Sequence, residues 1–331
     1  MKEETVDLSI VIPVLNEEAN LKPLYAELRE ALAALGRSYE IVFVDDGSTD
    51  GSAQVLAELH KADKRVKVIE FRRNFGKTAA LSAGFRLSRG QVVVTLDADL
   101  QDDPAEIGSL LGKLEEGYDL VAAWRFNRQD PLSKILPSRI FNWAVASLTG
   151  VRLHDFNCGF KAYRRAVTEE VKLYGELHRF IPVLASLKGF RIAETKVVHR
   201  PRRAGQSKYG VGRLGRGFLD FLTVIFLTTY LKRPLHLFGT VGIAIFLAGF
   251  VINTYMAYLR FFLDQAIGTR PLLLLGVLSM LLGLQVISMG LLGEMLRNLT
   301  FRPEEEYSIR RILDWRAGEP GLRQPSEASQ S

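Results

Sequence analysis

The stretch VVVTLDADLQDDP, residues 92–104, joins a run of apolar and β-branched residues to four aspartates. A short, continuous apolar run predicts a strand that is buried on both faces of a sheet. Carboxylates crowded at the end of such a strand repel one another, so the fold gains nothing from them unless a cation or hydrogen-bond donors lie among them. The stretch therefore predicts a buried strand that ends in a ligand-binding site. One acid has a second interpretation, because Asp103 before Pro104 is typical of a helix N-cap.

Three other apolar runs have the same character, and they occupy Leu8–Leu15, Glu40–Val44 and Val66–Phe71. A helical pattern that ends at Gly36 separates the first two. Alternating strands and helices predict an α/β fold with a mostly parallel sheet that is covered on both faces. In such a sheet the ligand lies beyond the carboxyl ends of the strands. The apolar residues of the predicted helix are Leu21, Leu24, Tyr25, Leu28, Leu32 and Leu35.

Carboxylates follow the predicted strands in three loops. Asp97 and Asp99 offer oxygen ligands that suit Mg²⁺ or Mn²⁺, although the pair alone also fits solvated loop acids. Asp45 and Asp46 lie beside glycines that permit close backbone approach, so they are candidates to bind a nucleoside. A simple Asx or glycine turn into a helix is the alternative for these two residues. The three loops are PVLNEE (residues 13–18), DDGSTDGS (residues 45–52) and DADLQDDP (residues 97–104).

The composition limits the class of protein. The chain of 331 residues has a formal net charge of +6 and 47% hydrophobic residues. This balance fits a nucleic acid, a phosphorylated substrate or an anionic membrane as partner, but the basic residues concentrate beside two apolar segments, which argues against nucleic acid. The first loop lacks the G-x-G-x-x-G turn of a dinucleotide-binding dehydrogenase. The single cysteine, Cys158, excludes an internal disulfide, and the N-terminus lacks the pattern of a signal peptide.

Two long segments, Leu235–Leu259 and Leu272–Gly293, contain no Asp, Glu, Lys or Arg. Each exceeds the roughly 20 residues that cross a bilayer, so both predict transmembrane helices. A buried helical hairpin of a soluble domain is the alternative. Basic residues flank the pair on its outer sides, which predicts a multi-pass protein of the inner (cell) membrane with both termini and the α/β domain in the cytoplasm. The flanking basic residues are Lys232, Arg233, Arg297, Arg302, Arg310 and Arg311.

The other segments complete the predicted order. Residues 1–210 form the α/β domain, and residues 211–233 form an interfacial helix along the membrane, because charges interrupt its apolar run. Residues 234–296 hold the two spans, at about 235–259 and 271–293. Residues 297–331 contain an amphipathic segment and a disordered tail. Three glycines of the first span, at positions 239, 242 and 249, permit close helix packing and with it a homo-oligomer.

The order of motifs in the first 210 residues resembles the family 2 glycosyltransferases, which use a nucleotide-binding domain of the GT-A type. The quoted loops are followed by FRRNFGKTAALSAGF (residues 71–85), DFNCGFKAYRR (155–165) and HRPRRAGQSKYG (199–210). With two C-terminal spans added, the chain is similar to the polyprenyl-phosphate glycosyltransferases, relatives of dolichol-phosphate mannose synthase. The resemblance implies a nucleotide-sugar donor, a polyprenyl (undecaprenyl) phosphate acceptor and a divalent cation.

The resemblance also implies roles on the donor side. Asp97 and Ala98 would extend a nucleoside pocket toward the ribose and the diphosphate. Asp97, Asp99 and Gln101 would hold Mg²⁺ or Mn²⁺, and Asp99 would be catalytic through this cation. The nucleoside pocket itself would be formed by Pro13, Leu15, Glu17, Val44, Asp45 and Asp46.

On the phosphate and acceptor side, the resemblance implies that Arg125, Arg202 and Lys208 pair with phosphates and that Arg125 is also catalytic. The planar fork of arginine holds phosphate oxygens in two directions, and lysine supplies a mobile point charge. Asp155 is a catalytic or positioning candidate near the acceptor, and a structural cap is its alternative. His178 fits an acceptor-site or structural role, and Cys158 fits a small buried packing residue.

The implied reaction is the inverting transfer of one sugar, with a UDP-linked hexose as the favoured donor. A lipid phosphate is largely ionised at neutral pH, because its second pKa is about 6, so it needs little help from a base. A mannose synthase that uses GDP-mannose and a non-enzymatic membrane scaffold are the alternatives. A processive polysaccharide synthase is disfavoured, because the chain has two predicted spans and no QxxRW motif.

Overall fold

The computed structural model describes residues 6–126, 142, 145–147, 149–173, 175, 177–198, 200, 234–268 and 270–300. The predicted interfacial helix at 211–233 and the segment after residue 300 lie outside the described residues. The α/β domain and the C-terminal helix pair are treated separately below. The strands of the domain are β1 (Leu8–Val14), β2 (Tyr39–Asp45), β3 (Val66–Glu70), β4 (Val92–Thr95), β5 (Leu120–Arg125), β6 (Lys161–Arg164) and β7 (Ile192–Val197). Its helices are α1 (Glu18–Leu35), α2 (Ser52–Ala62), α3 (Lys77–Leu87), α4 (Ile107–Glu115), α6 (Arg165–Glu170) and α7 (Ile181–Leu187), with 3-10 turns η1 (Pro104–Glu106) and η2 (Leu177–Phe180).

The described strands form one sheet of seven in the order β3-β2-β1-β4-β6-β5-β7. β1 pairs in parallel with β2 and β4, and β2 with β3, while β6 runs antiparallel between β4 and β5. β7 pairs in parallel with β5. The predicted α/β fold with a mostly parallel sheet is therefore confirmed, and the four strands predicted in the first hundred residues are all present.

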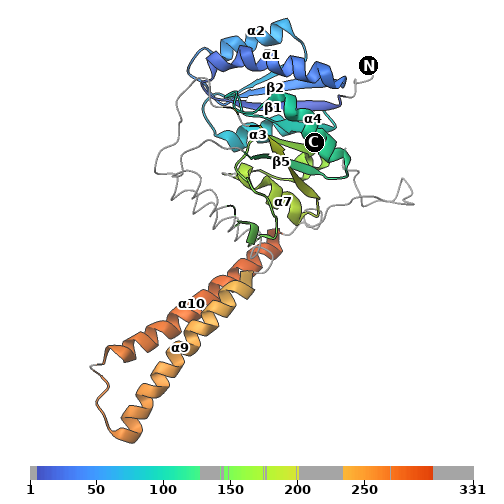
Figure 1. Cartoon of the computed structure of the whole chain (residues 1–331). Helices are drawn as coiled ribbons and strands as arrows, with labels where there is room; N and C mark the ends of the chain where they lie inside the picture. Colours follow the sequence, from blue (N-terminus) through green and yellow to red (C-terminus); the bar gives the residue numbers. More distant parts are fainter. Residues whose placement is uncertain are drawn as a thin grey trace, which may run out of the picture. The chain divides into compact units, whose positions relative to one another are not determined.

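Helices cover both faces of this sheet (Figure 1). One core cluster joins apolar residues of α1, α2 and α4 to one face of the strands, including Leu24, Leu56 and Leu110. A second cluster joins α3, α6, η2 and α7 to the opposite face, through residues such as Phe85 and Phe180. Side chains alternate between the faces of a strand, so each strand contributes to both clusters. This double covering explains the continuous apolar runs.

The first helix and the predicted cap follow the sequence pattern closely. α1 buries Leu21, Leu24, Leu28 and Leu32 and ends before Gly36, whose positive φ of 63° is a left-handed cap conformation. Asp103 caps η1, because its carboxylate accepts a hydrogen bond from the Ala105 amide at 3.0 Å. The predicted cap is confirmed, and the turn that it begins is a 3-10 turn that leads into α4.

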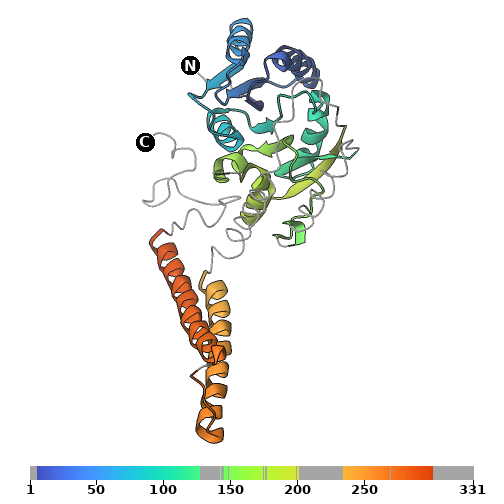
Figure 2. The same ribbon diagram turned by 90° about the vertical axis from the view of Figure 1, so that its left-hand side faces the viewer.

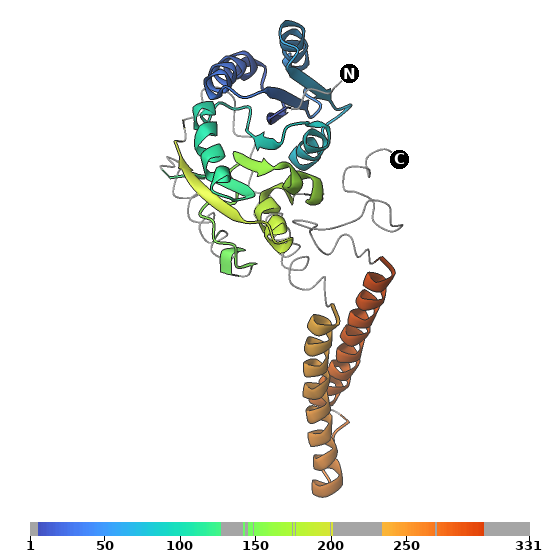
Figure 3. The same ribbon diagram turned by 90° about the vertical axis from the view of Figure 1, so that its right-hand side faces the viewer.

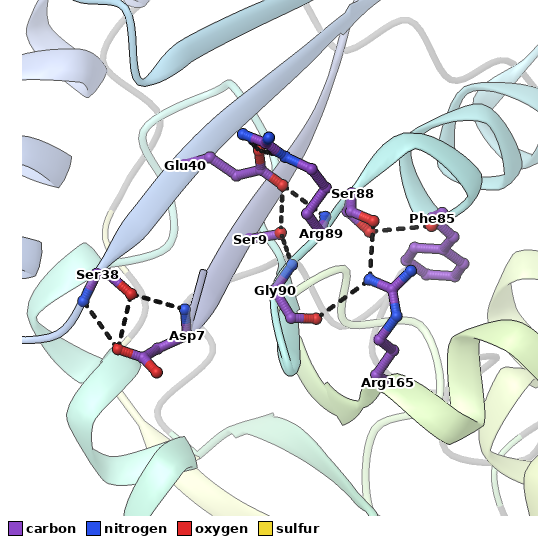
Figure 4. A network of polar contacts seen from close by, with 9 residues as sticks. All are labelled: Asp7, Ser9, Ser38, Glu40, Phe85, Ser88, Arg89, Gly90 and Arg165. Atoms are coloured by element: carbon purple, nitrogen blue, oxygen red, sulfur yellow. Dashed lines mark hydrogen bonds and ion pairs between the residues drawn. The ribbon is translucent and has the colours of Figure 1, made fainter. Parts of the chain in front are cut away.

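A buried polar network holds the amino-terminal edge of the sheet (Figure 4). The Ser9 hydroxyl donates to Glu40 at 2.7 Å, and the amide of Arg89 donates to the same carboxylate at 2.6 Å. The Gly90 amide donates to the Ser9 hydroxyl at 2.8 Å, and Arg165 reaches the carbonyls of Ser88 and Gly90. Because ligands bind at the carboxyl ends of such strands, this network serves the stability of the fold.

Gly90 gives a test of that assignment. A Cβ at this position would lie 2.5 Å from the Ser9 amide nitrogen, so we expect Gly90→Ala to lower the free energy of unfolding by about 1–3 kcal/mol. The purified variant should keep its ligand-binding edge intact at low temperature, because the change lies at the opposite, amino-terminal edge of the sheet. Gly112→Ala is the matched control: nothing lies within 4 Å of its Cβ position on α4, so it should raise stability by about 0.5–1 kcal/mol. Thermal unfolding of both variants measures the difference.

The C-terminal helices α9 (Pro234–Leu263) and α10 (Pro271–Thr300) lie side by side (Figures 2 and 3). Both are long and apolar enough to cross a membrane. Only 17% and 11% of the residues in their most apolar windows are buried, counted over the described residues, whereas the core hairpin of a soluble domain would be mostly buried. The arrangement fits a transmembrane hairpin with lipid-facing side chains.

Glycines bring the two helix backbones into contact. A Cβ on Gly242 would lie 2.7 Å from the Gly283 carbonyl oxygen, and a Cβ on Gly249 would lie 2.6 Å from that of Gly276. Small residues at such a crossing are typical of packed membrane helices. Gly242 and Gly249 are therefore used inside one hairpin, so they no longer argue for the homo-oligomer, which stays a prediction.

Gly283 tests the hairpin. We expect Gly283→Ile to lower the thermal stability of the detergent-solubilised protein by about 2 kcal/mol, because its side chain would displace the backbone of α9. Gly239→Ile is the matched control, since the nearest atom to its Cβ position belongs to Leu235 on the same helix, at 3.5 Å. Equal melting temperatures for the two variants would contradict the close contact between the backbones of α9 and α10 at Gly283.

Candidate active site

The loops after β1 and β2 are tied together at the carboxyl edge of the sheet. The Ser48 hydroxyl accepts from the Asn16 amide at 2.9 Å, and the Asn16 side chain accepts from the Thr49 amide at 2.7 Å. Asn16 has a positive φ of 52°, a conformation that asparagine tolerates better than most residues. The Glu17 amide donates to the Ser52 hydroxyl at 3.0 Å. The two loops therefore form one wall at this edge.

The paired acids after β2 both have partners within the chain. Asp45 accepts from the amide and hydroxyl of Ser48, as in an Asx turn. Asp46 accepts from the amides of Phe75 and Gly76 at 2.7 and 2.9 Å, which anchors the loop before α3. Burial raises the pKa of Asp46, although these two amides act in the opposite direction. The alternative of a turn is thus realised at Asp45, and nucleoside binding by either acid stays a prediction.

Asp97, directly after β4 and Leu96, is half-buried and forms an ion pair with Lys77 at 2.5 Å. Lys77 is the first residue of α3, so this contact joins the FGKT segment to the DADLQ loop. Burial raises the pKa of Asp97, but Lys77, with Arg125 and Lys161 as weaker contributors, lowers it by more. The carboxylate is therefore ionised at neutral pH.

The DADLQ loop has a strained backbone that other elements hold. Leu100 has a positive φ of 60°, which is rare for a residue with a branched side chain. The Gln101 amide donates to Asp99 at 3.2 Å, and the Gln101 carbonyl accepts from the Arg200 amide at 2.9 Å. The Arg200 guanidinium also pairs with Asp103 and, at 2.7 Å, with Glu27 of α1. The segment after β7 thereby supports the loop that contains Asp99.

Arg125 and Asp155 form a nearly buried ion pair. Arg125 is the last residue of β5, and its Nε donates to Asp155 at 2.6 Å, with side-chain exposures of 14% and 7%. Asp155 also accepts from the Asn157 amide at 3.1 Å. Both predicted residues thus lie together, and the pair has a structural role whatever else it does. The predicted phosphate-binding residues Arg202 and Lys208 lie outside the described residues.

The predicted metal ligands provide hard oxygen donors, which suit Mg²⁺ or Mn²⁺. Within the described part of the chain, no group of three or more His, Cys, Asp and Glu side chains is arranged to hold a metal ion. This donor set fits a cation that is bound by one or two carboxylates and completed by substrate phosphates and water. Asp97, Asp99 and Gln101 are the residues predicted to hold it, and this assignment stays a prediction.

Other predicted residues lie in the walls of the site or behind it. Pro13 and Leu15 are half-buried on and after β1, while Val44 and Ala98 are buried. Cys158 is buried and has no disulfide, as expected for a packing residue. Burial raises the pKa of its thiol far above the ordinary value, so it is no nucleophile.

His178 contacts the Thr78 hydroxyl at 2.8 Å. Burial, with the charges of Lys77 and Arg179 nearby, lowers the pKa of His178 to about 2. The imidazole is therefore neutral near physiological pH. Its contact with Thr78 is compatible with a structural role, and the acceptor-site role stays a prediction.

Sequence reasoning missed Lys77, Lys161 and Arg200. Lys77 follows Gly76 in the sequence FGKT and begins a helix. A side chain at the start of a helix can reach a neighbouring loop, so this position was the available signal. No local pattern indicated the partners of Lys161 or Arg200. The contacts of Arg200 join segments that are distant in the sequence, whereas Lys161 binds the turn that directly precedes it.

Solved structures share this fold. Glucosyl-3-phosphoglycerate synthase from Mycobacterium tuberculosis superposes with a TM-score of 0.52 at 20% identity, covering 67% of this chain and 78% of that chain. Mannosyl-3-phosphoglycerate synthase from Rubrobacter xylanophilus superposes with a TM-score of 0.53 at 19% identity, covering 66% of this chain and 73% of that chain. The α/β domain is therefore of the GT-A class.

Sequence comparisons define the family. The profile described as "Glycosyl transferase family 2" matches residues 9–172. The dodecaprenyl-phosphate galacturonate synthase of Rhizobium johnstonii is 38% identical over 318 residues, which cover 94% of each chain. The undecaprenyl-phosphate 4-deoxy-4-formamido-L-arabinose transferase of Pseudomonas aeruginosa LESB58 is 41% identical, covering 95% of this chain and 92% of the relative. The chain belongs to glycosyl transferase family 2, and it is a glycosyltransferase.

Proposed function

We propose that this glycosyltransferase moves one sugar from a UDP-linked donor to a polyprenyl phosphate, with undecaprenyl phosphate as the favoured acceptor. The observation that carries the proposal is the convergence at one edge of the sheet of Asp97, paired with Lys77, and the Arg125–Asp155 pair. The relatives named above are synthases or transferases whose names specify a dodecaprenyl or undecaprenyl phosphate. They match this chain over nearly its whole length, including the apolar helices.

The choice of donor is the finer part of the proposal. The structurally similar synthase of M. tuberculosis was crystallised with UDP and Mn²⁺, which supports UDP and a divalent cation here through the shared fold. A UDP-hexose is the favoured donor from the sequence. The names of the relatives specify galacturonate and 4-deoxy-4-formamido-L-arabinose, so UDP-linked uronic acids and amino-pentoses belong among the donors that are tested.

The residues of the site support a single displacement. A phosphate oxygen of the lipid attacks the anomeric carbon, the bond from that carbon to the nucleotide diphosphate breaks, and the configuration is inverted. Arg125 and Lys77 supply positive charge near the departing diphosphate, as phosphate-binding side chains do. A divalent cation held by Asp97, Asp99 and Gln101 would neutralise charge on the same leaving group. Asp155 orients Arg125 and, in this proposal, would lie toward the acceptor.

The two apolar helices support a reaction at a membrane surface. A hairpin of α9 and α10 would keep the domain beside its lipid substrate. The basic residues on the outer flanks of the hairpin favour the cytoplasmic face of the inner membrane, with both termini on that side.

A transfer assay tests the proposal. Purified protein in detergent is incubated with undecaprenyl phosphate, Mg²⁺ or Mn²⁺, and a panel of UDP-hexoses, UDP-uronic acids, UDP-amino-pentoses and GDP-mannose, and the lipid-linked product is identified by mass spectrometry. We expect product with a UDP-linked donor and none after chelation of the cation by EDTA. Product only with GDP-mannose would support the mannose synthase instead. Folded protein that neither binds a nucleotide nor forms any product would support the membrane scaffold.

A further inference from the structure

Lys161 is a buried lysine in the centre of the sheet. It is the first residue of β6, between Thr95 of β4 and Ala122 of β5, and it is 3% exposed. A buried ammonium group costs free energy unless its hydrogen-bond donors are satisfied. The role of this cation is not explained by the packing of the core.

The ammonium group of Lys161 binds the backbone of one turn. Its Nζ donates to the carbonyl of Phe156 at 3.4 Å and to that of Cys158. Both carbonyls belong to the turn from Asp155 to Gly159. Lysine reaches back over this turn from the strand that follows it, so one side chain fixes two of its peptide groups.

The turn connects the two carboxylates of the candidate site. At its beginning, Asp155 pairs with Arg125. At its end, Gly159 lies against Asp97, because a Cβ built on Gly159 would be 2.7 Å from each Asp97 carboxylate oxygen. The Thr95 hydroxyl donates to the Gly159 carbonyl at 2.6 Å. A shift of this turn would therefore move the surroundings of both Asp97 and Asp155.

We propose that Lys161 is a positioning residue, which holds the Asp155–Gly159 turn so that Asp97 on the donor side and Asp155 on the acceptor side keep a fixed separation. This inference rests on the proposed transfer function. Lys161 itself is too deeply buried to touch a substrate. It acts through the backbone that it binds.

The charge of Lys161 is set by its neighbours. Burial lowers the pKa of Lys161 to about 8, and Lys77 of α3 acts in the same direction. Asp155 of the turn and Asp97 after β4 act against the shift, and the neighbouring Cys158 thiol, whose own pKa burial raises, stays neutral in this range. The group is therefore mostly charged at pH 7 and loses its proton on moderate alkalinisation. Folding lowers the pKa of Lys161, so burial of its charged form lowers the free energy of unfolding. Deprotonation removes this cost, so the contribution of Lys161 to the free energy of unfolding rises with pH above about 8.

Three variants test the inference. For Lys161→Met we expect kcat to fall at least about tenfold, while the KM for the nucleotide sugar changes less than about threefold, because Lys77 still holds Asp97. Lys161→Arg keeps a charge and donors, so it should recover most of the lost kcat. Lys64→Met, at an exposed site, is the matched control and should behave as the wild type.

The pH profile separates positioning from simple stabilisation. In the wild type, kcat should decline above about pH 8 as Lys161 loses its proton, although the stability contribution of this group rises over the same range. The decline should move to higher pH in Lys161→Arg, since arginine stays charged. If Lys161→Met does not fold, Thr95→Val, which removes only the hydroxyl bound to Gly159, should show the same loss of kcat at nearly unchanged KM.

The outcomes are distinct. Wild-type kcat in Lys161→Met, an alkaline decline that is identical in Lys161→Arg, or a loss of kcat that simply follows the melting temperature would each overturn the inference. If the wild type forms no product with any donor, the proposed function fails. If the wild type forms product and the Lys161 variants have the same kcat as the wild type, only the inference about Lys161 fails.

Discussion

Asp99→Asn is expected to lower the rate of sugar transfer by about 10³-fold or more while the fold stays intact. Asparagine has nearly the same shape, and its side-chain oxygen can still accept the hydrogen bond that Gln101 donates to Asp99 at 3.2 Å. The loop, with the strained Leu100 and its support from Arg200, should therefore keep its conformation. What is lost is the negative charge that a divalent cation requires.

The measurement combines two readouts on the same preparation. Lipid-linked product is quantified by mass spectrometry, and Mn²⁺ binding in the presence of UDP is followed by electron paramagnetic resonance. Glu58→Gln is the matched control, because it removes a carboxylate charge from the exposed surface of α2, where Glu58 pairs with the exposed Lys22 at 2.9 Å. An Asp99→Asn variant that transfers sugar at the wild-type rate would remove Asp99 from the reaction.

Arg125→Met is expected to destabilise the domain by about 3–5 kcal/mol and to abolish transfer. The substitution leaves the Asp155 carboxylate, 7% exposed, without the guanidinium that binds it at 2.6 Å. An uncompensated charge in such surroundings costs far more than the pair contributes when it is intact. Thermal unfolding of the detergent-solubilised protein, with the transfer assay at low temperature, measures both effects.

The double variant Arg125→Met, Asp155→Leu separates the two effects. Replacing both charges with apolar groups of similar volume removes the stranded carboxylate, so stability should return to within about 1 kcal/mol of the wild type. Transfer should stay absent, because neither phosphate binding by Arg125 nor the acceptor-side carboxylate is restored. A double variant that regains transfer would show that the pair is purely structural. A double variant as unstable as Arg125→Met would show that the unpaired Asp155 carboxylate is not the cause of the instability.

Local patterns predicted much of the fold. The apolar runs predicted the strands β1 to β4, because a strand covered on both faces must be apolar along its whole length. The helical spacing of leucines and the position of Gly36 predicted α1 and its end. Asp103 and Pro104 predicted a capped turn, which is a property of a few adjacent residues. In each case the physical cause acts within one or two turns of chain.

The candidate site was predictable only in part. The carboxylates at strand ends indicated the right edge of the sheet, because parallel strands place their carboxyl ends together. The pattern did not show that Asp46 binds the amides before α3, or that Asp97 pairs with Lys77. It also gave no indication of Arg200, whose partner Glu27 is 173 residues away in the sequence. Such contacts depend on the packing of whole elements.

The sequence by itself determined the class of this protein: an α/β sheet with acids at its carboxyl edge, followed by two apolar segments of membrane length. These properties follow from periodicity and composition, which are local and additive. Only the tertiary structure decided which charges meet. It placed Lys77 on Asp97 and Arg125 on Asp155, because an ion pair requires close approach of groups that the chain here separates by 20 and 30 residues. It also placed the buried ammonium group of Lys161 on the carbonyls of Phe156 and Cys158, because the turn that precedes β6 folds back over this strand.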